Sequence, residues 1–363
     1  MLANIFAGFA KFGKGRKGMV GLDIGSSRVK AVELKANGKG GYELVSIGQM
    51  ALMTDTIVDG QIIDGNHVSD CITQIFVEQS IKNDQVATSI SGHAVIVKKI
   101  SVPTMSNEEL REQIQWEAEQ HIPFDINDVN LDYHVVEGAI GGNMDVLLVA
   151  CKKDVVSQIT QVVSQAGKAP AIVDVDAFAM QNAYEVSYHP QPGEVVMLLN
   201  IGASVMNINI VRGDNSLFMR DISMGGNQYT DMLQRELSLT FEQAEVLKRG
   251  GDVEGATVTF ADAEPFLQSV TEMVGSEVQR TLDFFYNQTS PDTEGLGRVL
   301  VAGGCSKVYG LLPYLAERLK VAVEPFDPFR SININAKKFD ENYIREFAPD
   351  MAVAVGLALR SAE

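Results

Sequence analysis

The sequence predicts an α/β protein built from two similar lobes, and three observations carry this prediction. The chain has 363 residues, more than the roughly 250–300 at which a single hydrophobic core stops growing. The phrase DIGSS at residues 23–27 returns as NIGAS at residues 200–204. A third phrase, VAGG at residues 301–304, is typical of a strand that ends in a Gly-Gly turn. The distance between the first two phrases is too long for a solenoid repeat and favours two domains that open with the same hairpin.

Composition and charge limit the classes of partner. Apolar residues make up 45% of the chain and charged residues 21%, as in globular proteins with a packed core. The formal charge of −17 argues against nucleic acid, which is bound by clustered Lys and Arg. An anionic ligand must therefore be bound by backbone amides and a few well-placed cations, because the overall field repels it.

The cysteines and the N-terminal segment indicate a cytoplasmic protein. Cys71, Cys151 and Cys305 have neither zinc-site nor disulfide spacing, and this suits a reducing compartment. No run approaches the ~20 apolar residues that span a bilayer. Residues 1–18 place apolar residues before basic ones, the reverse of a secretory signal. We expect a basic tail there, either solvated or resting on an anionic membrane surface.

The remaining elements follow from local patterns. Residues 19–34 and 197–211 each alternate around a small-residue turn, which predicts two β-hairpins. Between them, residues 89–168 predict a compact α+β segment, in which Ser106 and Glu109 form a capping box for a helix that ends before Pro123. Further helices are expected near residues 223–237, 241–251, 262–288 and 348–360, and residues 298–319 are expected to form a strand, a Gly-Gly turn and a helix in that order.

The three glycine-rich phrases suit a nucleotide. Small residues in a tight turn let backbone amides converge on a phosphate, and serine hydroxyls add donors. Lys30 could compensate phosphate charge, whereas Asp23 makes sense near a triphosphate only if Mg²⁺ with its water shell lies between them. The third phrase leaves room for a base or a ribose. Taken singly, each hairpin phrase is better explained by an ordinary tight hairpin, and the third phrase can be a plain strand-to-helix turn.

Together, in this order, the phrases resemble the phosphate-1, phosphate-2 and adenosine motifs of the actin, Hsp70 and sugar-kinase superfamily. The resemblance implies an actin-like two-domain fold with duplicated ribonuclease-H-like halves. Residues 244–249 (AEVLKR) resemble the superfamily helix that contacts ribose and adenine, and helices starting near Asp176 and Ala352 resemble the connecting elements at its hinge. The resemblance further implies one ATP with Mg²⁺ in an interdomain cleft, with Asp23 near the metal through water. The implied nucleotide-binding residues are Asp23, Gly25, Ser26, Ser27, Lys30, Asn200, Gly202, Ala203, Ser204, Gly225, Gly226, Glu245, Lys248, Gly303, Gly304, Ser306 and Lys307.

Within this superfamily, residues 102–133 (VPTMSNEELREQIQWEAEQHIPFDINDVNLDY) resemble the PilM family of type IV pilus assembly proteins. The segment that contains them resembles the relocated 1C subdomain shared with the cell-division protein FtsA. The implied domains are a first actin-like domain (1A) at 19–88 and 169–190, the 1C subdomain at 89–168, a second domain (2A/2B) at 191–350 and a C-terminal helix at 351–363 that returns to the first domain.

The PilM resemblance implies an adaptor on the cytoplasmic face of the inner membrane. It would bind the N-terminal cytoplasmic tail of the membrane protein PilN in a groove between 1A and 1C. The motor ATPase, the platform protein and self-association are further implied contacts. Two alternatives stay open, namely an active ATPase or kinase of the same fold and a polymerising protein similar to FtsA or MreB.

The sequence weakens the enzymatic alternative. Asn200 occupies a position where related hydrolases commonly carry an acidic residue, and an amide cannot act as a carboxylate base. Asp174 and Asp176 remain as groups that could orient water, although Asp176 equally suits a helix N-cap. No Ser/His/Asp constellation is recognisable. We therefore assign no catalytic residue and expect nucleotide binding with at most weak ATPase activity.

Overall fold

The computed structural model describes residues 4–5, 18–37, 40–140, 142–253, 257–288 and 295–360. The chain forms two compact units, the first made of Met1–Ala36, Leu44–Ala179 and Leu357–Glu363, the second of Asn37–Glu43 and Met180–Gly356. It passes from one unit to the other inside α4 (Asp176–Tyr188) and again inside α10 (Ala352–Ala358). Most of the expected basic tail at residues 1–18 lies outside the described residues.

The main sheet of the first unit is centred on the first predicted hairpin. Strand β2 (Val20–Ile24) is almost wholly buried, and it pairs antiparallel with β3 (Arg28–Ala36) and parallel with β7 (Gln85–Ile90). The sheet continues on one side through β11 (Ala169–Val175) to β1 (Asn4–Ile5). On the other side it continues through β4 (Tyr42–Ala51) to β17 (Ile332–Asn333), whose partners Tyr42 and Glu43 belong to the second unit.

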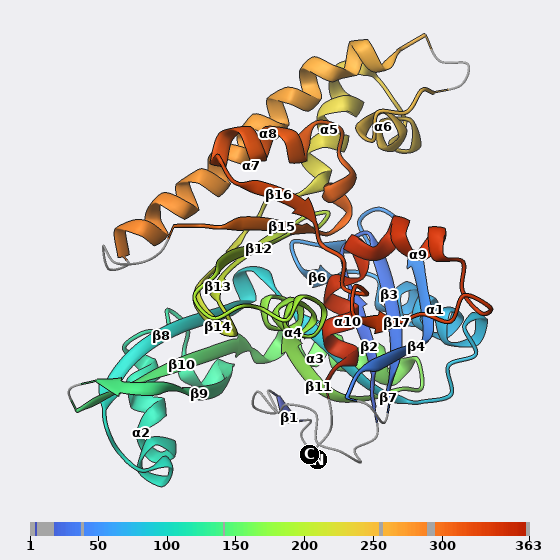
Figure 1. Cartoon of the computed structure of the whole chain (residues 1–363). Helices are drawn as coiled ribbons and strands as arrows, with labels where there is room; N and C mark the ends of the chain where they lie inside the picture. The colour runs from blue at the N-terminus through green and yellow to red at the C-terminus, as the bar shows by residue number, and fades with distance from the viewer. Residues whose placement is uncertain are drawn as a thin grey trace. The chain divides into compact units, whose positions relative to one another are not determined.

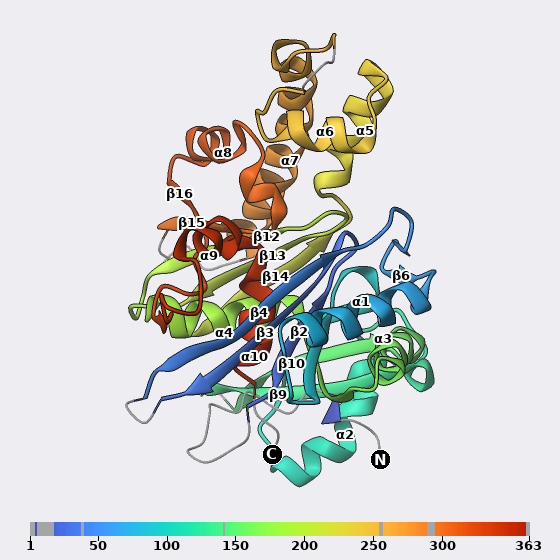
Figure 2. The same cartoon turned by 90° about the vertical axis from the view of Figure 1, so that its right-hand side faces the viewer.

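Two helices cover one face of this sheet. Helices α1 (Gly65–Glu78) and α3 (Lys153–Gln165) lie side by side, as Figure 2 shows. Leu22, Ile72 and Val163 meet in the core below them. A short hairpin of β5 (Ile57–Val58) and β6 (Gln61–Ile62) leads into α1.

The segment predicted as compact α+β forms a separate three-stranded antiparallel sheet. Its order is β8 (Val95–Pro103), β10 (Asn143–Lys152) and β9 (Val129–Ile140). Helix α2 (Asn107–Glu119) packs on one face through Leu110, Ile114 and Ala118. The predicted capping box is present, since Ser106 Oγ accepts from the Glu109 amide while the Glu109 carboxylate accepts from the Ser106 amide. Short 3-10 turns η1 (Gly92–Ala94) and η2 (Ile126–Asp128) flank these elements.

The second unit repeats the strand order of the first. Strand β12 (Val195–Ile201) pairs antiparallel with β13 (Met206–Arg212), which continues to β14 (Asn215–Ile222). On the other side of β12, β15 (Arg298–Ala302) and β16 (Ala322–Pro325) run parallel to it. Each unit therefore contains a hairpin whose first strand is followed in the sheet by two parallel strands (Figure 1). The repeated phrase predicted the hairpin in each unit but not the parallel strands beside it.

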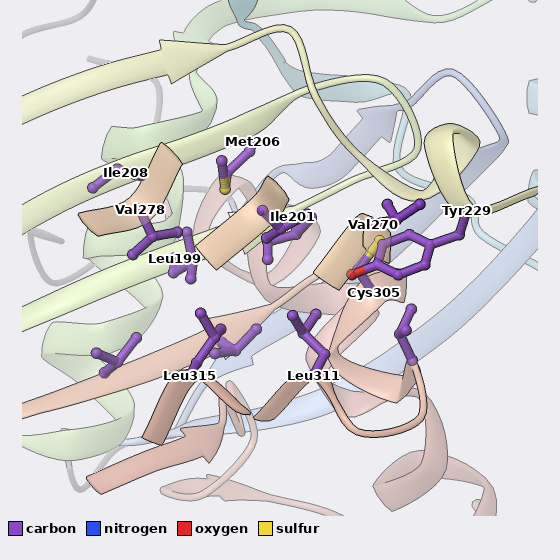
Figure 3. Close-up of a cluster of buried hydrophobic side chains, with 14 of the residues drawn as sticks. Leu199, Ile201, Met206, Ile208, Tyr229, Val270, Val278, Cys305, Leu311 and Leu315 are labelled. Atoms are coloured by element: carbon purple, nitrogen blue, oxygen red, sulfur yellow. The ribbon is translucent and has the colours of Figure 1, made fainter. Parts of the chain in front are cut away.

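Helices complete the core of the second unit. Apolar residues of β12 and β13 pack against one side of the long helix α7 (Phe260–Gln288) and against α8 (Leu311–Leu319), and Figure 3 shows Leu199, Ile201, Val270 and Leu311 in this cluster. The remaining helical elements are α5 (Gly226–Leu237), α6 (Phe241–Lys248), η3 (Gly304–Lys307), α9 (Glu341–Phe347) and η4 (Ala348–Met351). None of the helices in the described ranges is long and apolar enough to cross a membrane.

Candidate functional site

The two hairpin turns have the same backbone geometry. The Gly25 amide donates to the Arg28 carbonyl oxygen at 3.0 Å, and the Gly202 amide donates to the Val205 carbonyl oxygen at 2.9 Å. A Cβ at either glycine would lie within 3.3 Å of that same carbonyl oxygen, so each position favours glycine. Inside the two turns, the backbone amides of residues 26–27 and 203–204 make no hydrogen bond to another described residue. Each turn therefore offers two consecutive amides to an anion.

In the first hairpin, Asp23 and Lys30 are cross-strand partners. Asp23 Oδ2 lies 2.7 Å from Lys30 Nζ, and Asp23 is 7% exposed. The residues expected to face the metal and the phosphate thus neutralise each other. The described residues hold no cluster of three or more His, Cys, Asp or Glu side chains that could bind a metal. A Mg²⁺ ion near Asp23 would consequently take most of its ligands from water and phosphate oxygens.

Asp174 is held in a buried ion pair rather than in a position to orient water. Its Oδ2 lies 2.6 Å from Arg360 Nε, and its Oδ1 accepts from the Val175 amide at 2.8 Å. Asp174 is 1% exposed. Asp176 is the first residue of α4, and its carboxylate accepts from Ser89 Oγ at 2.6 Å. Asp176 thus stands at the start of α4, and its role as an N-cap stays a prediction.

The second hairpin is in close contact with the start of α5. The amides of Gly226 and Asn227 donate to the carbonyl oxygens of Gly202 and Ala203 at 2.9 and 2.8 Å. A Cβ on Gly225 would lie only 2.5 Å from the Gly202 oxygen and 2.6 Å from the Ala203 oxygen. The Gly-Gly turn is thus needed because the two backbones touch.

A buried charge pair joins α5 to α6. Lys248 is 7% exposed, and its Nζ donates to the Glu245 carboxylate, to Thr230 Oγ1 at 2.9 Å and to the Gly226 carbonyl oxygen at 3.4 Å. Burial raises the pKa of Glu245, but Lys248, Thr230 and Arg249 outweigh it and hold the pKa below its ordinary value. Glu245 is therefore ionised near neutral pH. Thr230, which the sequence did not single out, is hydrogen-bonded to both members of this pair.

The third phrase lies against the second hairpin. Gly303 has a φ of +83°, and a Cβ there would lie 2.4 Å from the Ile201 carbonyl oxygen and 2.8 Å from Asn200 Oδ1. Its amide donates to the Pro349 carbonyl oxygen at 2.9 Å. No other residue type fits this conformation and this contact without strain.

The turn after Gly303 is fixed by two side chains. Ser306 Oγ donates back to the Gly303 carbonyl oxygen at 2.8 Å. Lys307 Nζ lies 2.6 Å from Asp350 Oδ2 and 4.4 Å from the centre of the Phe347 ring. Asp350 was missed by sequence reasoning, because its partner is 43 residues away and no local pattern connects them.

Asn200 begins a chain of side-chain hydrogen bonds across the sheet. Its Nδ2 donates to Asn207 Oδ1, and Asn207 Nδ2 donates to Asp221 Oδ1, each at 2.9 Å. Asn207 is 4% exposed. The residue that replaces the expected acid is thus integrated into a structural network of amides.

The predicted nucleotide residues fall into two groups. Within the second unit, contacts bring together the second hairpin, the Gly-Gly turn of α5, the pair on α6 and the third phrase. The first hairpin, with Asp23 and Lys30, belongs to the first unit.

A pocket in the first unit lies where β6 and the start of α1 meet α3. Its volume is about 280 Å³. Gln165 Nε2 donates to Asn66 Oδ1 at 2.6 Å across it. The buried Oε1 of Gln158 accepts no hydrogen bond from the described residues. The lining residues are Ile62, Ile63, Asp64, Gly65, Asn66, Gln158, Gln161, Val162 and Gln165.

Comparison with known proteins identifies the family and the fold of this chain. The model of a family described as type IV pilus assembly protein PilM matches residues 21–362. A solved structure of a PilM-PilN type IV pilus biogenesis complex contains a chain that is 30% identical, with 96% of this chain and 99% of that chain covered and a TM-score of 0.85. The ethanolamine utilization protein EutJ from Carboxydothermus hydrogenoformans is 14% identical, with 96% and 92% covered and a TM-score of 0.54, and shares the fold. The chain therefore has the actin-like fold and belongs to the PilM family of type IV pilus assembly proteins.

Proposed function

We propose that this protein is an ATP-binding adaptor that captures the N-terminal cytoplasmic tail of the inner-membrane protein PilN. In that role it links the membrane alignment subcomplex to the cytoplasmic motor side of the pilus machine. The observation that carries the proposal is the 30% identity, over 96% of the chain, to a protein in a PilM-PilN complex. The adaptor itself is cytoplasmic and is held at the inner membrane through PilN.

The pocket beside α3 supports a binding groove for the tail. With the 1C subdomain taken as residues 89–168 and 1A as residues 19–88 and 169–190, α1 belongs to 1A and α3 to 1C. The pocket is therefore lined from both. The side-chain amides that line the pocket can exchange hydrogen bonds with the backbone of an extended peptide, while Ile62 and Val162 offer apolar contact. The free oxygen of Gln158 is an acceptor that a peptide amide would satisfy.

Filling the pocket tests its role directly. Gln161 lines the pocket, whereas Ser164 is an exposed α3 residue outside the lining. In a fluorescence polarisation titration with a labelled PilN-tail peptide, Gln161→Trp should weaken binding at least about tenfold, or about 1.4 kcal/mol. Ser164→Trp should leave the affinity unchanged. Equal affinities in all three proteins would remove the groove from the proposal.

For the nucleotide, we propose that both hairpins bind phosphates of ATP and that Mg²⁺ approaches Asp23 through water. When ATP and Mg²⁺ bind, Lys30 would exchange its ion pair with Asp23 for an ion pair with a phosphate. The metal ion would then compensate the charge of Asp23. Asn200 is held in an amide network and Asp174 is paired with Arg360, so neither residue supplies a free carboxylate base for rapid hydrolysis. ATP then acts by favouring one conformation of the protein, a shift of population rather than chemistry.

Coupling between ATP and the tail has its own test. The tail affinity is measured with and without Mg-ATP, for the wild type and for a Ser27→Ala, Lys30→Ala double variant. We expect ATP to tighten tail binding by the wild type and to have no effect on the variant. If ATP leaves the wild-type affinity unchanged, the coupling is wrong and the adaptor role survives.

A further inference from the structure

The outward face of α2 carries an exposed tryptophan that the tail groove does not use. Trp116 is the only tryptophan of the chain, and it is 72% exposed. The opposite side of α2 is buried against the sheet through Leu110, Ile114 and Ala118. Tryptophan is among the residues that contribute most to protein interfaces, because its large rigid ring loses little entropy on binding.

Acidic residues flank Trp116 along α2. Helical spacing places Glu112 one turn before Trp116 and Glu119 one turn after it on the same face. The helix contains five glutamates and one arginine. Glu112 and Glu119 are exposed and take part in none of the ion pairs of the described residues. We call the set Glu112, Gln113, Trp116, Glu119 and Gln120 the Trp116 surface.

The chain itself supplies a segment of complementary chemistry. Residues 6–17, which lie outside the described ranges, have the sequence FAGFAKFGKGRK. The segment contains four basic residues, no acid and three phenylalanines. Its cations match the glutamates and the face of the indole ring, and its aromatic rings match the apolar area of Trp116.

We propose that the Trp116 surface is a docking site for the basic N-terminal segment, residues 6–17. The contact combines cation–π and apolar contact at Trp116 with ion pairs to Glu112 and Glu119.

The sole tryptophan makes the contact measurable in the full-length protein. Acrylamide quenching of Trp116 emission is compared between the wild type and a full-length variant with Lys11→Gln, Lys14→Gln, Arg16→Gln and Lys17→Gln. Because docking covers one face of the ring, we expect the quenching constant of the wild type to be about half that of the variant. Raising the salt to about 0.5 M should abolish the difference, since exposed ion pairs are screened.

Acidic variants identify the surface. A synthetic peptide of residues 6–17 is added to the four-glutamine variant and should lower its quenching constant to the wild-type value. The further exchange Glu112→Gln with Glu119→Gln should weaken this effect at least about fivefold. The control exchanges Glu264→Gln and Glu317→Gln, at exposed positions on α7 and α8, should leave it unchanged.

Two results would overturn the proposal. The first is equal quenching of the wild type and the four-glutamine variant at low salt. The second is a peptide that changes the quenching only when vesicles containing about 30% phosphatidylglycerol are present, because the segment would then bind a membrane surface and not α2.

Discussion

Two carboxylates, the buried Asp174 and the half-buried Asp132, show how burial and pairing decide what a charged side chain can do. Asp174 is enclosed next to Arg360, and the pair joins the end of β11 to a residue 186 positions later in the chain. Removing one member of a buried pair leaves an uncompensated charge, which costs more than the pair contributes. Asp132, by contrast, accepts a hydrogen bond from the Tyr133 amide at 2.8 Å and has no ion-pair partner among the described residues.

Arg360→Met should lower the free energy of unfolding of the first unit by about 3–5 kcal/mol, because Asp174 remains buried without its partner. Urea denaturation followed by circular dichroism measures this change. The control is Arg345→Met, which breaks the exposed pair with Glu341 and should cost less than about 1 kcal/mol. Similar effects of the two exchanges would contradict the assignment of Asp174 to a buried ion pair.

Asp132 predicts a pH dependence with a definite sign. Burial raises its pKa from 3.8 to about 6, so folding favours the neutral form. The stability that this group contributes is present below its ordinary pKa and is lost as the pH rises through about 6. The thermal midpoint of the wild type should therefore fall relative to that of Asp132→Asn between about pH 4.5 and pH 7. A difference between the two midpoints that does not vary with pH would refute this.

Between the second hairpin and α5, close backbone contact determines which residues are allowed. The Gly225-Gly226 turn lets α5 donate two amides to the hairpin carbonyls. Gly225 has an extended φ of −171°, so the requirement for glycine comes from the missing space and not from its conformation. The same reasoning holds for Gly303 against Ile201, where a positive φ adds a second requirement.

Gly225→Ala should separate α5 from the hairpin, because the new methyl group would overlap two carbonyl oxygens. We expect a loss of about 1–3 kcal/mol and faster hydrogen exchange of the Gly226 and Asn227 amides. Gly295→Ala is the matched control, since no atom lies within 4 Å of its added Cβ. Unchanged exchange at Gly226 would show that this contact does not hold the helix.

Local patterns made several elements predictable from the sequence. Both hairpins, the capping box at Ser106 and the helix with Leu110 and Ile114 depend on neighbouring residues, and the structure confirms them. The cross-strand pairing of Asp23 with Lys30 follows from the hairpin register, yet the sequence alone suggested separate ligands for them. Asp350 with Lys307 and Asp174 with Arg360 could not be predicted, because tertiary packing alone joins residues so far apart.

Across the whole molecule, the repeated sheet order explains why one phrase occurs twice. Each unit has a hairpin flanked by two parallel strands, so each places the same glycine turn at the end of its first strand. The strand order of the sheets could not be read from hydropathy alone, and the resemblance of the phrases to the actin superfamily implied the duplicated halves. The three-stranded sheet of β8, β10 and β9, together with α2, contains the sequence that resembles the PilM family. This part of the chain therefore separates it from other members of the actin superfamily.

The adaptor role is tested most directly by isothermal titration of the PilN cytoplasmic tail into the full-length protein with Mg-ATP present. The proposed function predicts saturable binding with one tail per chain, and no binding of a peptide with the same composition in scrambled order. Absence of heat from the native tail, with a correctly folded protein and saturating ATP, would contradict the claim that this chain captures PilN.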